Sequence, residues 1–243
     1  MDPIEEFKQE RKQAIALMAQ DQELKQKSID WMIHADRYKY SYNFSWLGRP
    51  VIKLPADILA LQEIIWNVKP DLIIETGIAH GGSIVFSASM LEIIGKGEVV
   101  AVDIDIRAHN RREIEANPMM KRITMIEGSS VDPAIVDRIR QIAIGKERVM
   151  VFLDSLHSHE HVLAECRAYA DIVTPGSYMV VMDTYVELFP KGYFQNRPWD
   201  KGDNPMTAMQ AFLKENPNYA IDHEITDKLL ISEGIDAYLK RLR

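Results

Sequence analysis

From residue 71 onward the chain alternates between two patterns of apolar positions. Short β-branched runs are typical of buried strands, and the longer stretches between them carry apolar residues at helical spacing. The runs predict strands at residues 72–75, 98–103, 123–126, 149–153, 178–183 and 228–232. The spacing predicts helices at residues 82–94, 107–117, 132–143, 158–170 and 205–215. This order predicts an α/β fold with a doubly wound, largely parallel sheet covered by helices on both faces.

The first 54 residues follow a different pattern, and we expect a helical and aromatic extension ahead of a main domain at residues 55–243. Residues 4–35 are charge-rich with apolar positions at helical spacing, which predicts one or two helices outside the sheet. Such extensions cover a site or build an oligomer contact, so a homo-oligomer is expected. The aromatic segment at residues 38–50 fits either a loop pinned to the core by large rings or a wall for a substrate or for adenine.

The loop at residues 186–205 is too long for a plain connector. Its prolines, glycines and aromatic residues predict a lid or specificity segment over the site. The residues expected to select the substrate there are Phe189, Tyr193, Trp199, Asp203 and Asn204.

Composition and charge narrow the function classes. The 243 residues carry a net charge of −7 and are 47% hydrophobic, with an isoelectric point near 5.5. Broad binding to nucleic acid or anionic membrane requires a basic surface, so a small molecule is the expected partner. The single cysteine, Cys166, leaves no partner for an intrachain disulfide. No apolar run approaches the roughly 20 residues of a membrane span, and the start lacks the regions of a signal peptide, so a cytoplasmic location is expected.

A glycine-rich turn follows the first predicted strand of the sheet. Gly77 and Gly81 stand between the strand that carries Glu75 and the helix that begins near Ser83. Glycine permits close approach of a ligand to the backbone, and the first turn of a helix offers free N–H groups to a carboxylate or phosphate. Together with the acidic end of the next strand, this turn indicates an adenosine-containing cofactor.

The ends of the next two strands offer further cofactor contacts. Asp103 and Asp105 both follow the second apolar run; we favour Asp103 as the ribose ligand and interpret Asp105 as a cap of the following helix. Ser129 and Ser130 follow the third strand. Their small side chains fit either an adenine contact or an ordinary turn and helix cap.

Two aspartates end neighbouring strands, where ligands of parallel sheets bind. Asp154 follows the fourth strand and Asp183 the fifth. Carboxylates that face each other favour a bound hard cation such as Mg²⁺ or Ca²⁺. His157, three residues after Asp154, is suited to act as a general base. The alternatives are that each aspartate only caps a helix, and that His157 belongs with two following histidines to a solvated helix start or a zinc cluster.

Several segments resemble a known family. The glycine turn at residues 75–83, the strand at 99–105 and the Gly-Ser-Ser at 128–130 resemble class I S-adenosylmethionine-dependent methyltransferases. More narrowly, residues 42–50, 103–107, 126–130 and 154–161 resemble the cephalosporin hydroxylase (cephalosporin 7-methoxylation) family, over most of the chain from Tyr38 onward. The resemblance implies a Rossmann-like sheet with an antiparallel strand near the C-terminus. It also implies Mg²⁺-dependent methyl transfer to oxygen on a natural product or sugar.

The resemblance, together with a more distant one to catechol-type O-methyltransferases, also implies roles for single residues. The implied catalytic residues are His157 and Asp154. The implied metal ligands are Asp154, Asp183 and Thr184. The implied cofactor-binding residues are Glu75, Gly77, Gly81, Ser83, Asp103, Ser129 and Ser130. The chain departs from some relatives at Met182, where they carry a glutamate before the aspartate, which puts the third protein ligand in doubt.

Two other functions share part of this pattern. A nicotinamide-dependent enzyme acting on a nucleotide sugar would use the glycine turn and Asp103, but it leaves the paired aspartates Asp154 and Asp183 unexplained. A non-catalytic cofactor-binding subunit would have no use for those aspartates or for His157.

Overall fold

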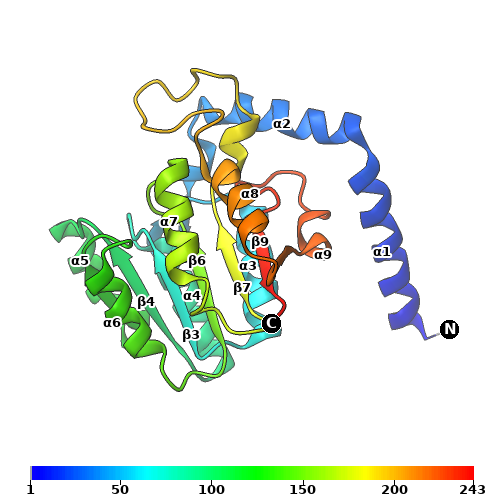
Figure 1. Cartoon of the computed structure of the whole chain (residues 1–243). Coiled ribbons are helices and arrows are strands. Elements are labelled where there is room, and N and C mark those ends of the chain that lie inside the picture. The colour runs from blue at the N-terminus through cyan, green and yellow to red at the C-terminus, as the bar shows by residue number, and fades with distance from the viewer. Residues whose placement is uncertain (1) are drawn as a thin grey trace.

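A seven-stranded sheet forms the centre of the protein in the computed structural model, which describes residues 2–243 (Figure 1). The strands are β3 (Leu72–Thr76), β4 (Glu98–Asp103), β5 (Ile123–Glu127), β6 (Val149–Leu153), β7 (Tyr178–Val181), β8 (Tyr219–Ile221) and β9 (Tyr238–Arg241). Their order is β5-β4-β3-β6-β7-β9-β8. The first five are parallel, and β9 pairs antiparallel with both β7 and β8. The predicted sheet, with its antiparallel C-terminal strand, is confirmed.

Helices cover both faces because alternate residues of each strand point to opposite sides. Ile73 of β3 belongs to a core shared with one set of helices, and its neighbour Ile74 belongs to the core on the other face. The helices that contribute buried residues to the first core are α3 (Pro55–Val68), α4 (Gly82–Ile94), α5 (Ala108–Glu115) and α9 (His223–Thr226). Those that contribute to the second core are α6 (Pro133–Ala143), α7 (His159–Tyr169) and α8 (Pro205–Glu215).

Two helices precede the sheet, α1 (Pro3–Gln20) and α2 (Gln22–Asp36). Asp21 separates them, and its carboxylate accepts a hydrogen bond from the amide of Leu24 to begin α2. α1 has no buried residue and projects beside the body of the protein (Figure 1). A 3-10 turn η1 (Tyr40–Asn43) and a hairpin of β1 (Phe44–Trp46) and β2 (Arg49–Val51) connect them to α3. Within the described range, no helix has the length and apolar character needed to cross a membrane.

One predicted strand is wrong. Residues 228–232 are irregular, and the strand beside β7 is β9. The physical reason lies in α3, where the buried Asp57 accepts hydrogen bonds from the Ser232 hydroxyl and the Glu233 amide at 2.5 and 2.9 Å. These bonds hold the segment against the helix, outside the sheet. Two short 3-10 helices, η2 (Pro118–Arg122) and η3 (Thr184–Leu188), were also not predicted.

Candidate active site

The carboxyl edge of the sheet brings together the three residues that the sequence singled out for metal and acid–base chemistry. β6 and β7 are neighbours, so the residues that follow them, Asp154 and Asp183, lie side by side. One ligand atom each of Asp154, His157 and Asp183 lies within 4.8 Å of the others, and His157 Nε2 is 3.7 Å from Asp183 Oδ2. Neither aspartate side chain caps a helix: α7 begins after Ser158, and the Asp183 side chain makes no capping hydrogen bond to η3. The alternative interpretation of both as caps is wrong.

A lysine that the sequence did not reveal completes this cluster. Lys53, between β2 and α3, is 3% exposed, and its Nζ lies 2.7 Å from Asp154 Oδ2. Burial alone lowers the pKa of Lys53, but the carboxylates of Asp154, Glu233 and Glu75 outweigh it and raise that pKa above its usual value. Lysine is almost never buried unless it is paired. Lys53 therefore carries a permanent positive charge into the site.

The two aspartates are driven to opposite protonation behaviour. Burial raises the pKa of Asp154, but Lys53 and then His157 outweigh that effect and hold it below its usual value. Burial, with a further contribution from the charge of Asp154, raises the pKa of Asp183 to about 6. A charged carboxylate beside one that resists ionisation is typical of two acidic groups that share a buried site. Carboxylate oxygens at this spacing fit one hard divalent cation, whose charge would favour the ionised form of Asp183.

The side chains on either side of Asp183 make contacts away from the aspartate pair. Thr184 is fully buried, and its hydroxyl donates a hydrogen bond to the Ile235 carbonyl oxygen at 2.6 Å. Met182 is buried in the core against the helices of the first face. Thr184 thus ties η3 to the segment before β9, and its role as a metal ligand stays a prediction.

The glycine turn is shaped by contacts within the chain. Gly77 has a φ of +89°, and a Cβ atom there would clash with the backbone carbonyl of Asp154. Gly81 has a φ of +84° at the start of α4, where a Cβ atom would meet the side chain of Ile114. Glycine at position 77 is therefore what allows the glycine turn to touch the strand end that carries Asp154.

Asp103 holds that loop from the other side. Its Oδ2 accepts hydrogen bonds from the amides of Ile78 and Ala79 at 2.8 and 3.3 Å. The interpretation of Asp105 as a helix cap is wrong, because α5 begins after Arg107 and has no side-chain cap. The Asp105 amide instead donates a hydrogen bond to Asp103 Oδ1 at 3.1 Å, and the Asp105 side chain is exposed.

Glu75 and Ser83 present unpaired polar atoms at the base of the loop. Glu75 is 1% exposed, and burial raises its pKa to about 7 although Lys53 opposes the shift. Within residues 2–243, neither Glu75 Oε2 nor Ser83 Oγ has a hydrogen-bond partner. Because buried polar atoms are normally paired, these two fit the polar end of a bound cofactor.

The histidines after His157 do not form a solvated helix start. His159 Nδ1 lies 2.8 Å from Thr207 Oγ1, and His161 contacts the buried Ser130 and the half-buried Ser155. In the described part of the chain, the one group of potential ligands that converges is Asp154, His157 and Asp183, so the zinc alternative finds no support. Ser129 lies half-buried in the turn after β5, and Ser130 beside it is buried.

The predicted lid residues divide into two kinds. The Trp199 ring lies edge-on to His157 with 4.8 Å between centroids, and the Arg197 guanidinium lies over the same ring. Asp203 accepts a hydrogen bond from the amide that begins α7, and Tyr193 donates one to Asp36 of α2 at 2.8 Å. Phe189 is fully buried and Asn204 caps α8, so both support the loop from inside.

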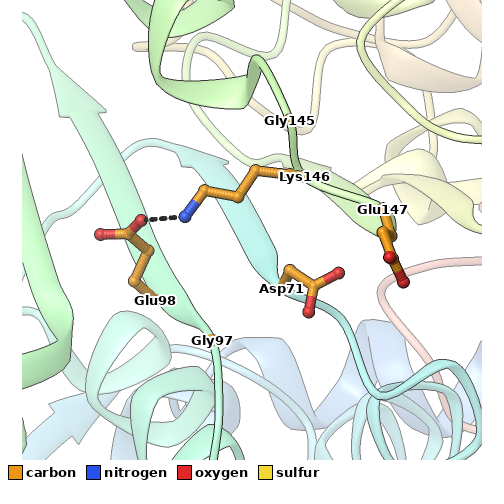
Figure 2. Close-up of a pocket in the computed structure, with 6 residues that line it drawn as sticks. All are labelled: Asp71, Gly97, Glu98, Gly145, Lys146 and Glu147. Carbon is orange, nitrogen blue, oxygen red and sulfur yellow. Dashed lines mark hydrogen bonds and ion pairs between the residues drawn. The ribbon is translucent and has the colours of Figure 1, made fainter.

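A pocket lies at the edge of the sheet opposite the candidate site, at the amino ends of β3, β4 and β6. Figure 2 shows Asp71, Glu98 and Glu147 around it, with Lys146 paired to Glu98 at 2.6 Å. Asp71 is likewise paired, to Lys96. Because ligands of parallel sheets bind at the carboxyl ends of the strands, we assign this pocket no part in the chemistry.

Comparison with known proteins identifies relatives of this architecture. The family model described as rhamnosyl O-methyltransferase/CmcI matches residues 38–242. A rhamnosyl O-methyltransferase of Mycobacterium tuberculosis is 31% identical over 207 residues, which cover 81% of this chain and 78% of the relative. Its counterpart in Mycobacterium leprae is 30% identical and covers 71% and 72% of the two chains. A CmcI structure with Mg and SAM superposes with a TM-score of 0.60 at 18% identity, over 83% of this chain and 78% of the other, which indicates a shared fold.

Proposed function

Because the chain belongs to the rhamnosyl O-methyltransferase/CmcI family and is an S-adenosylmethionine-dependent O-methyltransferase, we propose that it uses Mg²⁺ or another hard divalent cation to methylate a sugar or natural-product hydroxyl. The observation that carries the proposal is the convergence of Asp154, His157 and Asp183 within 4.8 Å, beside a loop that Gly77 brings against Asp154. The names of the curated relatives support a sugar acceptor.

On this proposal, the cofactor lies along the turn between β3 and α4. Glu75 and Ser83, with their unpaired oxygens, and the backbone at Gly77 and Gly81 would hold its methionine end. The remaining proposed contacts are Asp103 for the ribose and Ser129 and Ser130 for the adenine. The sulfonium supplies the methyl group, and the main task of the protein is to hold the acceptor oxygen in line with it, where orientation contributes several kcal/mol.

Asp154 and Asp183 would hold the cation, with the Thr184 oxygen as a third ligand. When bound, the cation supplies Lewis acidity that lowers the pKa of an acceptor hydroxyl. Lys53 keeps Asp154 ionised and fixed in place before any ligand arrives. His157, 3.7 Å from Asp183, would take the proton of the acceptor hydroxyl. The lid would close the site, with Trp199 packed on His157 as its aromatic wall.

Calorimetry on the purified protein tests cofactor and metal separately. We expect S-adenosylmethionine and S-adenosylhomocysteine to bind, and NAD⁺ not to bind. Asp183→Asn should keep S-adenosylhomocysteine affinity and lose Mg²⁺ binding, because it removes a charge at the proposed cation site and leaves the glycine turn intact. Asp132→Asn, which alters a helix cap on α6, serves as the control.

Activity is measured by mass spectrometry on a panel of glycosides and phenols after dialysis against chelator. We expect methylation of glycosides to stop on dialysis and to return with Mg²⁺. Full activity of Asp154→Ala with chelator present would refute the metal mechanism. Methylation of phenols in preference to every glycoside would refute the sugar acceptor.

A further inference from the structure

A buried carboxylate on α7 joins the two halves of the site. Glu165 is 0% exposed, and one of its oxygens, Oε1, accepts hydrogen bonds from Ser130 Oγ at 2.6 Å and from Ser155 Oγ at 2.7 Å. Ser130 belongs to the loop after β5, where the adenine is proposed to lie. Ser155 directly follows Asp154. A single oxygen atom therefore connects the loop after β5, called the cofactor loop below, to the strand end that carries the proposed cation site.

The same face of α7 holds the loop at two further points. Tyr169, four residues after Glu165, donates its hydroxyl to the Ser130 carbonyl oxygen at 2.8 Å. His161, four residues before it, has its Nε2 3.2 Å from Ser130 Oγ and 3.1 Å from Ser155 Oγ. Residues four apart lie one above the other on a helix. The three side chains form a row along α7, in which Glu165 and His161 contact both serines and Tyr169 contacts Ser130.

Fold stability alone does not account for a carboxylate at this position. Burying a charge is costly, and a well-packed apolar side chain in place of a buried charged group is often neutral or stabilising. The second oxygen of Glu165, Oε2, is buried without a hydrogen-bond partner among residues 2–243, which adds to the cost. The geometry that the carboxylate does secure is the fixed separation of Ser130 and Ser155.

We propose that Glu165 is a positioning residue that sets the cofactor loop against the cation-bearing strand end, so that methyl donor and acceptor meet in line. The inference rests on the proposed function. A displacement of about 1 Å in such an alignment costs on the order of a hundredfold in rate. Glu165 contacts neither proposed ligand; it acts through Ser130 on the cofactor and through Ser155 on Asp154.

Binding measurements on single variants separate these two branches. Glu165→Ala should weaken S-adenosylhomocysteine binding about tenfold in calorimetry, because both serines lose the carboxylate oxygen that fixes their separation and keep only their contact with His161. Ser130→Ala should reproduce that loss. Ser155→Ala should keep S-adenosylhomocysteine affinity and raise the Mg²⁺ concentration needed for half-maximal activity.

The conservative variant distinguishes positioning from packing. Glu165→Gln keeps an oxygen that can accept both serine hydroxyls, so its S-adenosylhomocysteine affinity should stay within about twofold of the original protein. Arg167→Ala changes an exposed residue of the same helix, α7, and breaks its pair with Glu215 of α8; it controls for damage to α7 and should leave both affinities unchanged.

The inference is overturned if Glu165→Ala binds S-adenosylhomocysteine as tightly as the original protein, or if Glu165→Gln loses as much affinity as Glu165→Ala. Should Glu165→Ala fail to fold, Ser130→Ala and Ser155→Ala decide, because each removes one hydroxyl. If Ser130→Ala and Ser155→Ala change S-adenosylhomocysteine affinity and the Mg²⁺ requirement in the same way, the separate action of Glu165 through the two serines is overturned. If the original protein itself binds no S-adenosylhomocysteine, the proposed function fails and the inference falls with it.

Discussion

Lys53→Met tests how strongly the buried ion pair controls the site. The substitution keeps an unbranched apolar side chain but removes an ammonium that is 3% exposed and 2.7 Å from Asp154 Oδ2. It leaves the Asp154 carboxylate without its cation, beside the buried Glu75 and Glu233. Removing one partner of a buried pair costs about 3–5 kcal/mol. Because the Asp154 side chain is 20% exposed and water screens it in part, the expected loss of unfolding free energy is near the lower end, about 3 kcal/mol.

Urea unfolding followed by circular dichroism measures that loss against a matched pair. Lys96 lies 2.6 Å from Asp71 Oδ1, the same chemistry at nearly the same distance, but is 44% exposed. Lys96→Met should therefore cost less than about 1 kcal/mol. With a slope of about 2–3 kcal/mol per M, the midpoint of Lys53→Met should fall by about 1 M while that of Lys96→Met barely moves.

The pH dependence supplies an independent check. The folded pKa of Asp154 lies below its usual value of 3.8, so the pair stabilises the fold above that pH, and the stabilisation is lost as pH falls toward the folded pKa. The difference between the original protein and Lys53→Met should accordingly shrink below about pH 4. Equal losses for Lys53→Met and Lys96→Met, or a difference that grows in acid, would refute the argument from burial.

Three further outcomes are expected. Burial raises the pKa of Glu75 to about 7, so the folded protein keeps a proton that the unfolded chain releases near 4.5. The free energy of unfolding should therefore fall by on the order of 3 kcal/mol as the pH rises between those two values. Glu75→Gln should remove that decline from urea titrations. Gly77→Ala combines positive φ with a backbone clash and should cost about 3 kcal/mol or more, whereas Gly95→Ala, with similar φ and open space, should cost about 1 kcal/mol in thermal unfolding. Tyr193→Phe frees the lid from Asp36 and should speed proteolysis within residues 186–205 several-fold, with no change in the melting temperature.

The sheet was predictable because the signal is local. Strands buried on both faces, such as β3 and β6, read as apolar runs, and the glycine turn at residues 77–82 marks the end of β3. The same locality brought Asp154 and Asp183 into view, since both directly follow such runs. The strand predicted at residues 228–232 failed because the hydrogen bonds of Ser232 and Glu233 to Asp57 hold its end against α3, and the apolar run does not reveal this partner about 175 residues away.

The residues that the sequence did not reveal are those whose roles depend on distant partners. Lys53 reads as an ordinary lysine before a helix, yet it is buried against Asp154, 101 residues later. Glu165 reads as one polar position on an amphipathic helix, yet it is fully buried between Ser130 and Ser155. The one local indication of a buried ion pair or hydrogen bond is a charged residue in a segment that is otherwise expected to be buried. Such a residue does not show which distant side chain it contacts.

At Met182 the chain departs from the implied motif, and a buried acid from another segment stands near the same site. Its buried thioether stands at the edge of the sheet where the family resemblance implies a carboxylate. Glu233, delivered by the segment that Asp57 anchors, restores a buried acid nearby: burial and then the charge of Asp183 raise its pKa well above the usual value. Glu233 does not belong to the group of side chains that converge within 4.8 Å, so it would act on a cation from a distance, and only in its ionised form. A cation that binds between Asp154 and Asp183 relieves the repulsion on all three carboxylates, which favours binding without a third acidic ligand.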